Sequence, residues 1–170
     1  MSEELRQLYV QKHQDCPNYG TSATAHISKL KELIKKRKWS SILDFGCGKA
    51  VLSEAIPGIT NYDFAIPEYS KLPDGTFDAA FCIDVLEHIP EDELPEVLQY
   101  LQTHAKSVYF CIHMGESIHK LANGEPCHCT VRSADWWIER LSDYWNNIEL
   151  LALGKVHLTA VVSWPGFEKV

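Results

Sequence analysis

Residues 42–48 read Ile-Leu-Asp-Phe-Gly-Cys-Gly, an apolar run with one acid followed by two glycines one residue apart. Because Gly46 and Gly48 lack Cβ, the backbone can take positive φ there and lie directly against a ligand. The first amides of a following helix would be free to donate hydrogen bonds to it. Val51 stands where a dinucleotide-binding G-x-G-x-x-G pattern needs glycine, which disfavours NAD. The pattern indicates a nucleotide-like ligand, with a plain tight turn as the alternative.

An acid closes the next predicted strand, residues 59–63. Asp63 follows Asp44 by roughly twenty residues, the spacing of a βαβ unit. A carboxylate in that position lies beside the glycine turn and can accept hydrogen bonds from both hydroxyls of a ribose. An Asx turn before Pro67 is the alternative explanation of this acid.

Residues 77–89 contain an apolar run that ends at Asp84, a pattern typical of a strand buried on both faces. In this order, the three segments resemble the class I S-adenosylmethionine-dependent methyltransferases. Residues 43–48 are similar to the family's first motif. Asp-Val-Leu-Glu-His at 84–88 is similar to the sequence that follows its fourth strand. The resemblance covers roughly residues 40–162, and Tyr19-Gly20 adds a looser similarity to small bacterial and phage members.

The resemblance implies S-adenosylmethionine as the cofactor and S-adenosylhomocysteine (SAH) as the product. It implies that the methionine end of the cofactor lies at the glycine turn, with Asp44 near the amino group and the ribose at Asp63. The cofactor-binding residues that it implies are Asp44, Phe45, Gly46, Cys47, Gly48, Asp63, Phe64, Asp84 and Val85.

The chain departs from the family pattern between the ribose acid and the fourth strand. Residues 64–76 are too few to build the usual crossover helix and a further strand, so we predict that one edge strand and one helix are missing. The family's adenine-contacting acid usually follows that strand, so adenine is expected to be held by apolar contact. Nearby side chains that could supply it are Ile66, Tyr69 and Leu72. At the third glycine position the chain has Ala50, a small change.

The elements that must position these residues alternate along the chain. Helices are predicted over residues 3–13, 23–38, 51–56, 91–102 and 133–144, and strands over 42–45, 59–63, 77–83, 107–113, 148–153 and 156–164. They predict one Rossmann-like α/β domain with a mostly parallel sheet, an antiparallel C-terminal strand and helices on both faces. We expect N-terminal helices within residues 1–39 to pack on a methyltransferase-like unit of residues 40–170.

Composition limits the partners. The net charge of −7 disfavours a nucleic-acid partner, because such binding depends on neutralising phosphates. There is no apolar run of membrane-spanning length, and the amino terminus is acidic, so no membrane partner and a cytoplasmic location are expected. The six cysteines are then expected to be reduced thiols. The oligomeric state stays open.

The acceptor of the methyl group is expected in the loops at the carboxyl ends of the strands. His128 is the candidate catalytic base, because imidazole titrates in the neutral range and methylation of oxygen or nitrogen releases a proton. A hydrogen-bonded structural histidine is the alternative. Further polar candidates in these loops are Asp84, Glu87, His88, His113, Met114, His119, Asn123, Cys127 and Arg132.

A metal site is not expected from the spacing of soft ligands. The set considered is Cys111, His113, His119, Cys127, His128 and Cys129. Structural zinc sites use ligand pairs two to four residues apart, whereas Cys127 and Cys129 would point to opposite sides of an extended chain. The predicted function is methyl transfer to a small-molecule or glycan-like acceptor. The alternatives are a catalytically degenerate S-adenosylmethionine- or SAH-binding protein and an enzyme that uses S-adenosylmethionine for other chemistry.

Overall fold

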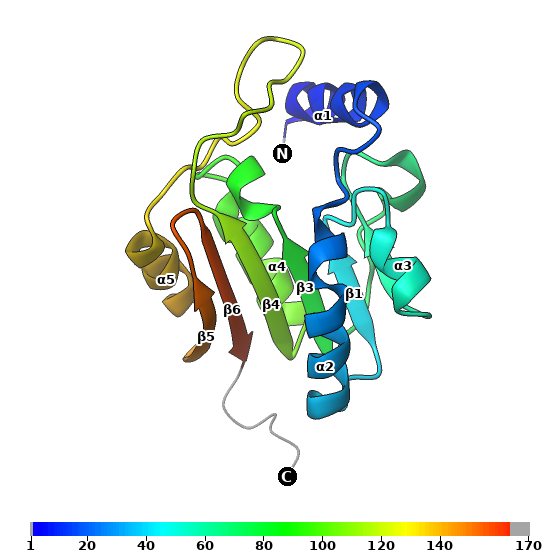
Figure 1. Cartoon of the computed structure of the whole chain (residues 1–170), viewed down its shortest axis with the longest axis vertical. Helices are drawn as coiled ribbons and strands as arrows, with labels where there is room; N and C mark the ends of the chain where they lie inside the picture. The colour runs from blue at the N-terminus through cyan, green and yellow to red at the C-terminus, as the bar shows by residue number, and fades with distance from the viewer. Residues whose placement is uncertain (1, 164–170) are drawn as a thin grey trace.

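Six strands form one sheet in the order β2-β1-β3-β4-β6-β5 (Figure 1), in a computed structural model that describes residues 2–163. The strands are β1 (Ile42–Phe45), β2 (Thr60–Tyr62), β3 (Ala79–Ile83), β4 (Ser107–His113), β5 (Asn147–Leu153) and β6 (His157–Ser163). The first four strands are parallel, and β6 runs antiparallel to both β4 and β5. The predicted Rossmann-like sheet with an antiparallel C-terminal strand is confirmed.

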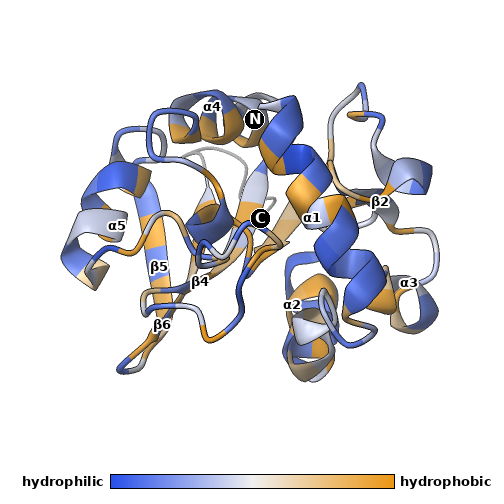
Figure 2. Ribbon diagram, turned by 90° about the horizontal axis from the view of Figure 1, so that it is seen from above, coloured by the Kyte–Doolittle hydropathy of each residue, from blue (hydrophilic) through white to orange (hydrophobic). Residues whose placement is uncertain are grey.

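Helices cover both faces of this sheet, as predicted. They are α1 (Glu3–Asp15), α2 (Ile27–Arg37), α3 (Val51–Ala55), α4 (Leu94–His104) and α5 (Ala134–Ser142), with 3-10 turns η1 (Ser22–His26), η2 (Pro67–Tyr69) and η3 (Leu86–His88). Successive strand residues point to opposite faces, so Cys82 joins a core with Leu98 of α4 and Trp137 of α5. Phe81 joins a second core with Leu33 of α2. Figure 2 shows α4 and α5 on one side of the sheet and α2 and α3 on the other.

Two helix predictions need correction. The helix predicted over 23–38 is divided into η1 and α2, and α2 ends where Lys38 takes a left-handed conformation with φ 55°. The helix predicted over 91–102 begins later, at Leu94, and extends to His104. Residues 91–93 form a turn that bonds back to the carbonyl of Pro90, and Pro95 occupies the first helical turn, where its missing N–H costs nothing.

The other elements lie close to their predicted places. Ser133 caps α5 as expected, its side chain accepting a hydrogen bond from the amide of Trp136. The closing pair β5 and β6 is joined through Gly154 and Lys155, although Trp164, in the predicted last strand, lies outside the described residues. None of the helices in residues 2–163 is long and apolar enough to cross a bilayer.

The sheet lacks the strand and helix that the sequence predicted to be missing. Strand β2 pairs only with β1 and forms an edge, and residues 64–76 contain no regular element except η2. Helix α1 lies across the carboxyl ends of the strands (Figure 1) and packs through Tyr9 against Leu121 and Cys127. The cavity described next therefore has α1 and the segment 114–132 above it.

Candidate active site

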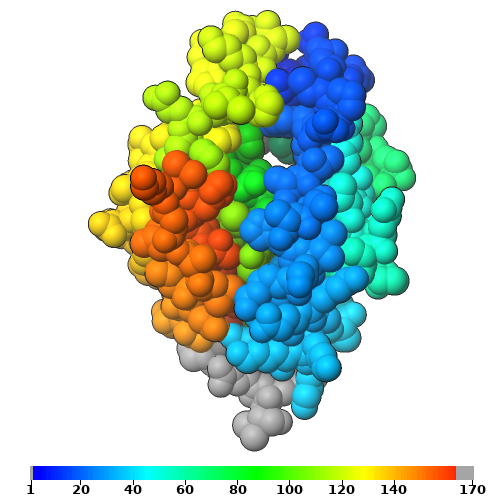
Figure 3. Space-filling view, in the orientation of Figure 1, coloured from blue at the N-terminus to red at the C-terminus, as the bar shows by residue number. Residues whose placement is uncertain are grey.

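A cavity of about 300 Å³ opens at the carboxyl ends of β1, β2, β3 and β4. In Figure 3 a hollow is visible between the N-terminal segment (blue) and the yellow-green segment 114–132. Of the cofactor-binding residues that the resemblance implied, all but Phe45 line the cavity: Asp44, Gly46, Cys47, Gly48, Asp63, Phe64, Asp84 and Val85. The ring of Phe45 packs in the core against Tyr62 and Tyr100. Of the acceptor-side candidates, His88, His113, His119 and His128 line the cavity, whereas Glu87, Met114, Asn123, Cys127 and Arg132 do not.

The glycine turn is held by close backbone packing. Gly46 and Gly48 have φ of 80° and 50°, in the left-handed region. A Cβ on Gly46 would lie 2.3 Å from a methyl of Val85, and a Cβ on Gly48 would lie 2.5 Å from the carbonyl oxygen of Gly20. The amides of Gly46 and Cys47 both donate to the carbonyl of Tyr62, 2.7 and 3.0 Å away. Glycine is therefore required by the contacts of the turn with its neighbours.

Asp63 fixes this turn. Its Oδ2 accepts a hydrogen bond from the amide of Gly48 at 2.8 Å, and its Oδ1 accepts one from Ala65 at 2.9 Å. Each carboxylate oxygen has a second lone pair, so Asp63 can still accept hydrogen bonds from a ligand in the cavity that it lines.

Two further acids at this end have an oxygen without a hydrogen-bond partner among the described residues. Asp44 is 2% exposed and its Oδ2 is unpaired, and burial, followed by the charge of Asp63, raises its pKa to about 7. Asp84 has an unpaired Oδ1 and a φ of 52°, unusual for a residue with a side chain. Both carboxylates would be stabilised by a cationic group in the cavity.

Three imidazole rings meet at the other end of the cavity. The ring centre of His128 lies 4.8 Å from that of His88 and 4.8 Å from that of His113. The Nδ1 of His88 lies 2.8 Å from the carbonyl oxygen of Cys127, and the Nδ1 of His128 lies 2.8 Å from that of Gly115. A carbonyl only accepts, so each Nδ1 carries the proton and each Nε2 has a free lone pair in the neutral ring.

Burial favours the neutral form of two of these rings, His88 and His128. Burial lowers the pKa of His88 to about 3, and burial also lowers the pKa of His128. Beside them Glu87 is completely buried; its Oε1 accepts a hydrogen bond from the amide of His113, and its Oε2 has no partner in the described part of the chain. Burial and then the charge of Asp84 raise the pKa of Glu87. The buried carboxylate of Glu87, with one unpaired oxygen, would therefore be stabilised by a proton or by a cation.

Metal-ligand atoms gather in one place among residues 2–163. They belong to Glu87, His88 and His128, and all lie within 4.8 Å of one another. Of the cysteines and histidines weighed from spacing, only His128 belongs to this group. All six cysteines are free thiols.

Sequence reasoning missed the contribution of the N-terminal segment. Tyr9, His13 and Tyr19 line the cavity, together with Gly20, which lies against the glycine turn. The only signal for them was the loose similarity at Tyr19-Gly20. The expected adenine contacts are also placed differently, because the residues lining the cavity include none of Ile66, Tyr69 and Leu72. Phe64 is the residue of the segment 64–76 that does line the cavity.

No model of a protein family matches the sequence, and no curated protein matches it. Solved structures do match. The DhpI–SAH complex aligns with a TM-score of 0.67 and 14% identity, covering 97% of this chain and 100% of that chain. The methyltransferase domain of bacterial CtHen1 aligns with a TM-score of 0.58 and 16% identity, over 81% of this chain and 97% of that chain. The N-terminal domain of EvdMO1 with SAH bound aligns with a TM-score of 0.56 and 13% identity, over 81% of this chain and 80% of that chain. The chain therefore has the fold of the class I methyltransferases.

Proposed function

We propose that this protein binds S-adenosylmethionine and transfers its methyl group to a small-molecule or glycan-like acceptor. The observation that carries the proposal is that one cavity joins a glycine turn with buried acids to a group of imidazoles. The solved relatives in fold named above include two with SAH bound, DhpI and EvdMO1.

The cofactor would lie at the glycine-turn end. The backbone of Gly46, Cys47 and Gly48 would face its methionine part, and the carboxylate of Asp63 would accept hydrogen bonds from the ribose. Asp44 would pair with the ammonium group, which removes the cost of its buried, unpaired oxygen. Phe64 offers an apolar face for adenine, while Val85 and Asp84 border the sulfonium side. Phe45 would contribute through its backbone alone.

The acceptor would lie toward the imidazoles. Its oxygen or nitrogen attacks the methyl carbon, the new bond forms as the carbon–sulfur bond breaks, and the electron pair of that bond stays on sulfur to give SAH. The acceptor loses one proton in this step. Nε2 of His128, whose Nδ1 is committed to the carbonyl of Gly115, is the candidate base for this proton.

The charge of the chain favours an uncharged or cationic small acceptor over a nucleic acid, since a net charge of −7 repels phosphates. The six free thiols fit a reducing compartment, and we place the activity in the cytoplasm. A catalytically degenerate S-adenosylmethionine- or SAH-binding protein is the second candidate. It is favoured by the short segment 64–76, none of whose acids lines the cavity to read adenine.

Titration calorimetry with S-adenosylmethionine and with SAH tests the proposal. We expect saturable binding of both, and release of SAH when a pool of small hydroxyl- and amine-bearing compounds is added with S-adenosylmethionine. NAD is the matched negative control, because Val51 replaces the glycine that a dinucleotide site needs. Absence of binding to both ligands would refute the function. Binding without turnover in any acceptor pool would select the second candidate.

A further inference from the structure

The cluster of Glu87, His88 and His128, called the triad below, has the spacing of a metal site. Its ligand atoms all lie within 4.8 Å of one another. Atoms that bind one ion at about 2.0–2.2 Å lie no more than roughly 4.4 Å apart. Small side-chain rotations would therefore bring all three onto a single ion.

Both imidazoles of the triad are oriented as metal-bound histidines usually are. Ligating histidines commonly donate one ring N–H to a carbonyl or carboxylate, which fixes the ring and leaves the other nitrogen for the metal. His88 and His128 each have Nδ1 at 2.8 Å from a backbone carbonyl oxygen. The hydroxyl of Tyr9 donates to the carbonyl of Cys127 at 2.6 Å, which fixes the group that holds His88.

The carboxylate of the triad has a buried, unpaired oxygen that a cation would stabilise. Glu87 is 0% exposed, and its Oε2 has no hydrogen-bond partner among residues 2–163. The neighbouring Asp84 has an unpaired Oδ1 as well. Leaving a buried carboxylate oxygen unpaired is unfavourable. The histidines of the triad do not relieve it, because their N–H groups point to carbonyls.

We propose that the triad binds a divalent first-row transition-metal ion. Two imidazole nitrogens and one carboxylate oxygen suit zinc, cobalt, iron or manganese, and three protein ligands leave positions open for another molecule. His88 and His128 line the same cavity as the glycine turn, so an ion held by them would border the space proposed for the methyl donor.

The role of this ion in catalysis rests on the proposed function. The ion would bind the acceptor hydroxyl and lower its pKa, so that the proton would leave to water. The oxygen would attack the methyl carbon as the carbon–sulfur bond breaks, with the electron pair staying on sulfur. With the ion bound, His128 would be a metal ligand, and water would replace it as the acceptor of the proton.

Titration of chelator-treated protein with cobalt chloride tests the site, because cobalt bound by nitrogen and oxygen ligands gives visible d–d absorption. We expect one equivalent to bind, with zinc and manganese chlorides competing. In Glu87→Gln, Oε1 can still accept from the amide of His113, and in His128→Asn the side-chain amide can still donate to Gly115. Each variant should weaken cobalt binding by more than about 100-fold, beyond the usual effect of losing an outer-shell partner.

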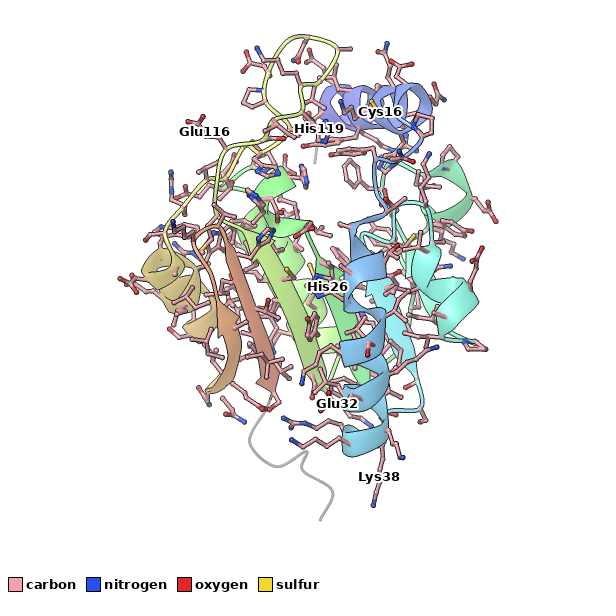
Figure 4. The ribbon with its side chains drawn as sticks, in the orientation of Figure 1. Cys16, His26, Glu32, Lys38, Glu116 and His119 are labelled. Carbon is pink, nitrogen blue, oxygen red and sulfur yellow. The ribbon has the colours of Figure 1, made fainter. Side chains whose placement is uncertain are left out.

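His119→Ala is the matched control. His119 lines the same cavity on the segment near α1 (Figure 4), but it is exposed and lies outside the triad. We expect its cobalt affinity to stay within about three-fold of the parent protein. Circular dichroism checks that each variant is folded.

Three results would overturn the proposal: no saturable binding of any of the three ions by the parent protein, equal binding by Glu87→Gln and His128→Asn, or equal loss in His119→Ala. Calorimetry with SAH separates this outcome from failure of the proposed function. Cobalt binding without SAH binding would support the metal site and refute the proposed function. Methyl transfer at an unchanged rate in chelator would return His128 to the role of base and overturn the catalytic part.

Discussion

The two ends of the cavity are held together by different means. At the end proposed to hold the cofactor, called the cofactor end below, backbone hydrogen bonds predominate: the amides of Gly46, Cys47 and Gly48 bond to Tyr62 and Asp63, within residues 46–63. At the triad end, side chains bond across long distances in sequence, such as Tyr9 to Cys127. A backbone cradle tolerates changes in side chains but not in glycines, whereas the triad end depends on particular polar atoms.

The largest expected effect tests the cradle. In Gly46→Ala the new Cβ would lie 2.3 Å from Val85, and we expect SAH affinity to fall by more than about 100-fold, or 2.7 kcal/mol. Gly58→Ala is the control, since its φ of 83° matches but nothing lies within 4 Å of its Cβ. It should lose only roughly 1 kcal/mol of stability and keep its affinity for SAH. Equal affinities in the two variants would contradict a backbone cradle.

Asp63 is the side chain that both supports the glycine turn and is proposed to bind the ribose. Asp63→Ala should weaken SAH binding roughly ten-fold or more, because a hydrogen bond to a charged group contributes about 1.5–3 kcal/mol. An SAH analogue without the ribose 2′-hydroxyl separates ribose binding from support of Gly48. The parent protein should bind it less well than SAH, and Asp63→Ala should not distinguish the two. A variant that still discriminates would refute the ribose contact.

Tyr9→Phe should loosen the triad end alone. It removes the donor to the Cys127 carbonyl, so amides in residues 114–132 should exchange with solvent roughly ten-fold faster, a local loss of about 1.4 kcal/mol. Amides of β1 serve as the internal reference, and SAH affinity should change by less than about three-fold. Faster exchange throughout the sheet would mean that the two ends are not independent.

Asp44→Asn tests how much the buried carboxylate of Asp44 destabilises the folded protein. The folded pKa of Asp44 is raised to about 7 from the usual 3.8, so its favourable contribution to folding exists below about pH 4 and is lost as the pH rises to about 7. The amide avoids this loss, and urea denaturation at about pH 8 should show the variant more stable by on the order of 1 kcal/mol. The gain in stability of the variant should shrink at about pH 5. At both pH values the variant should bind SAH less tightly than the parent protein does. A variant less stable at the higher pH would contradict this assignment.

The smallest expected effect concerns adenine. With no acid of residues 64–76 lining the cavity, the inosyl analogue of SAH should bind within about ten-fold, or 1.4 kcal/mol, of SAH. A site built on a buried hydrogen bond to the exocyclic amine would reject it far more strongly. Asp78 is not available as a hidden reader, because it bonds to Ser40 and Lys106 at the amino end of β3. A loss of two orders of magnitude would point to Asp74 instead.

The sequence indicated how the glycine-turn end of the cavity is built more fully than the triad end, for a physical reason. A glycine turn between two strands is encoded by neighbouring residues, so the spacing of Gly46, Gly48 and Asp63 predicts that they lie together, as they do in the structure. Their role in binding the cofactor stays a prediction. The missing edge strand followed from the length of residues 64–76. The triad depends on the path of the segment 114–132, which is governed by tertiary contacts such as that of Tyr9, and no local pattern contains them.

The position of α1 over the cavity also has a kinetic consequence. Tyr9 and Lys12 both donate hydrogen bonds to carbonyls of the segment 114–132, at Cys127 and Lys120. Breaking these two bonds would widen the access to the cavity. For an enzyme of the proposed kind, we therefore expect the residence time of SAH to depend on how often they break.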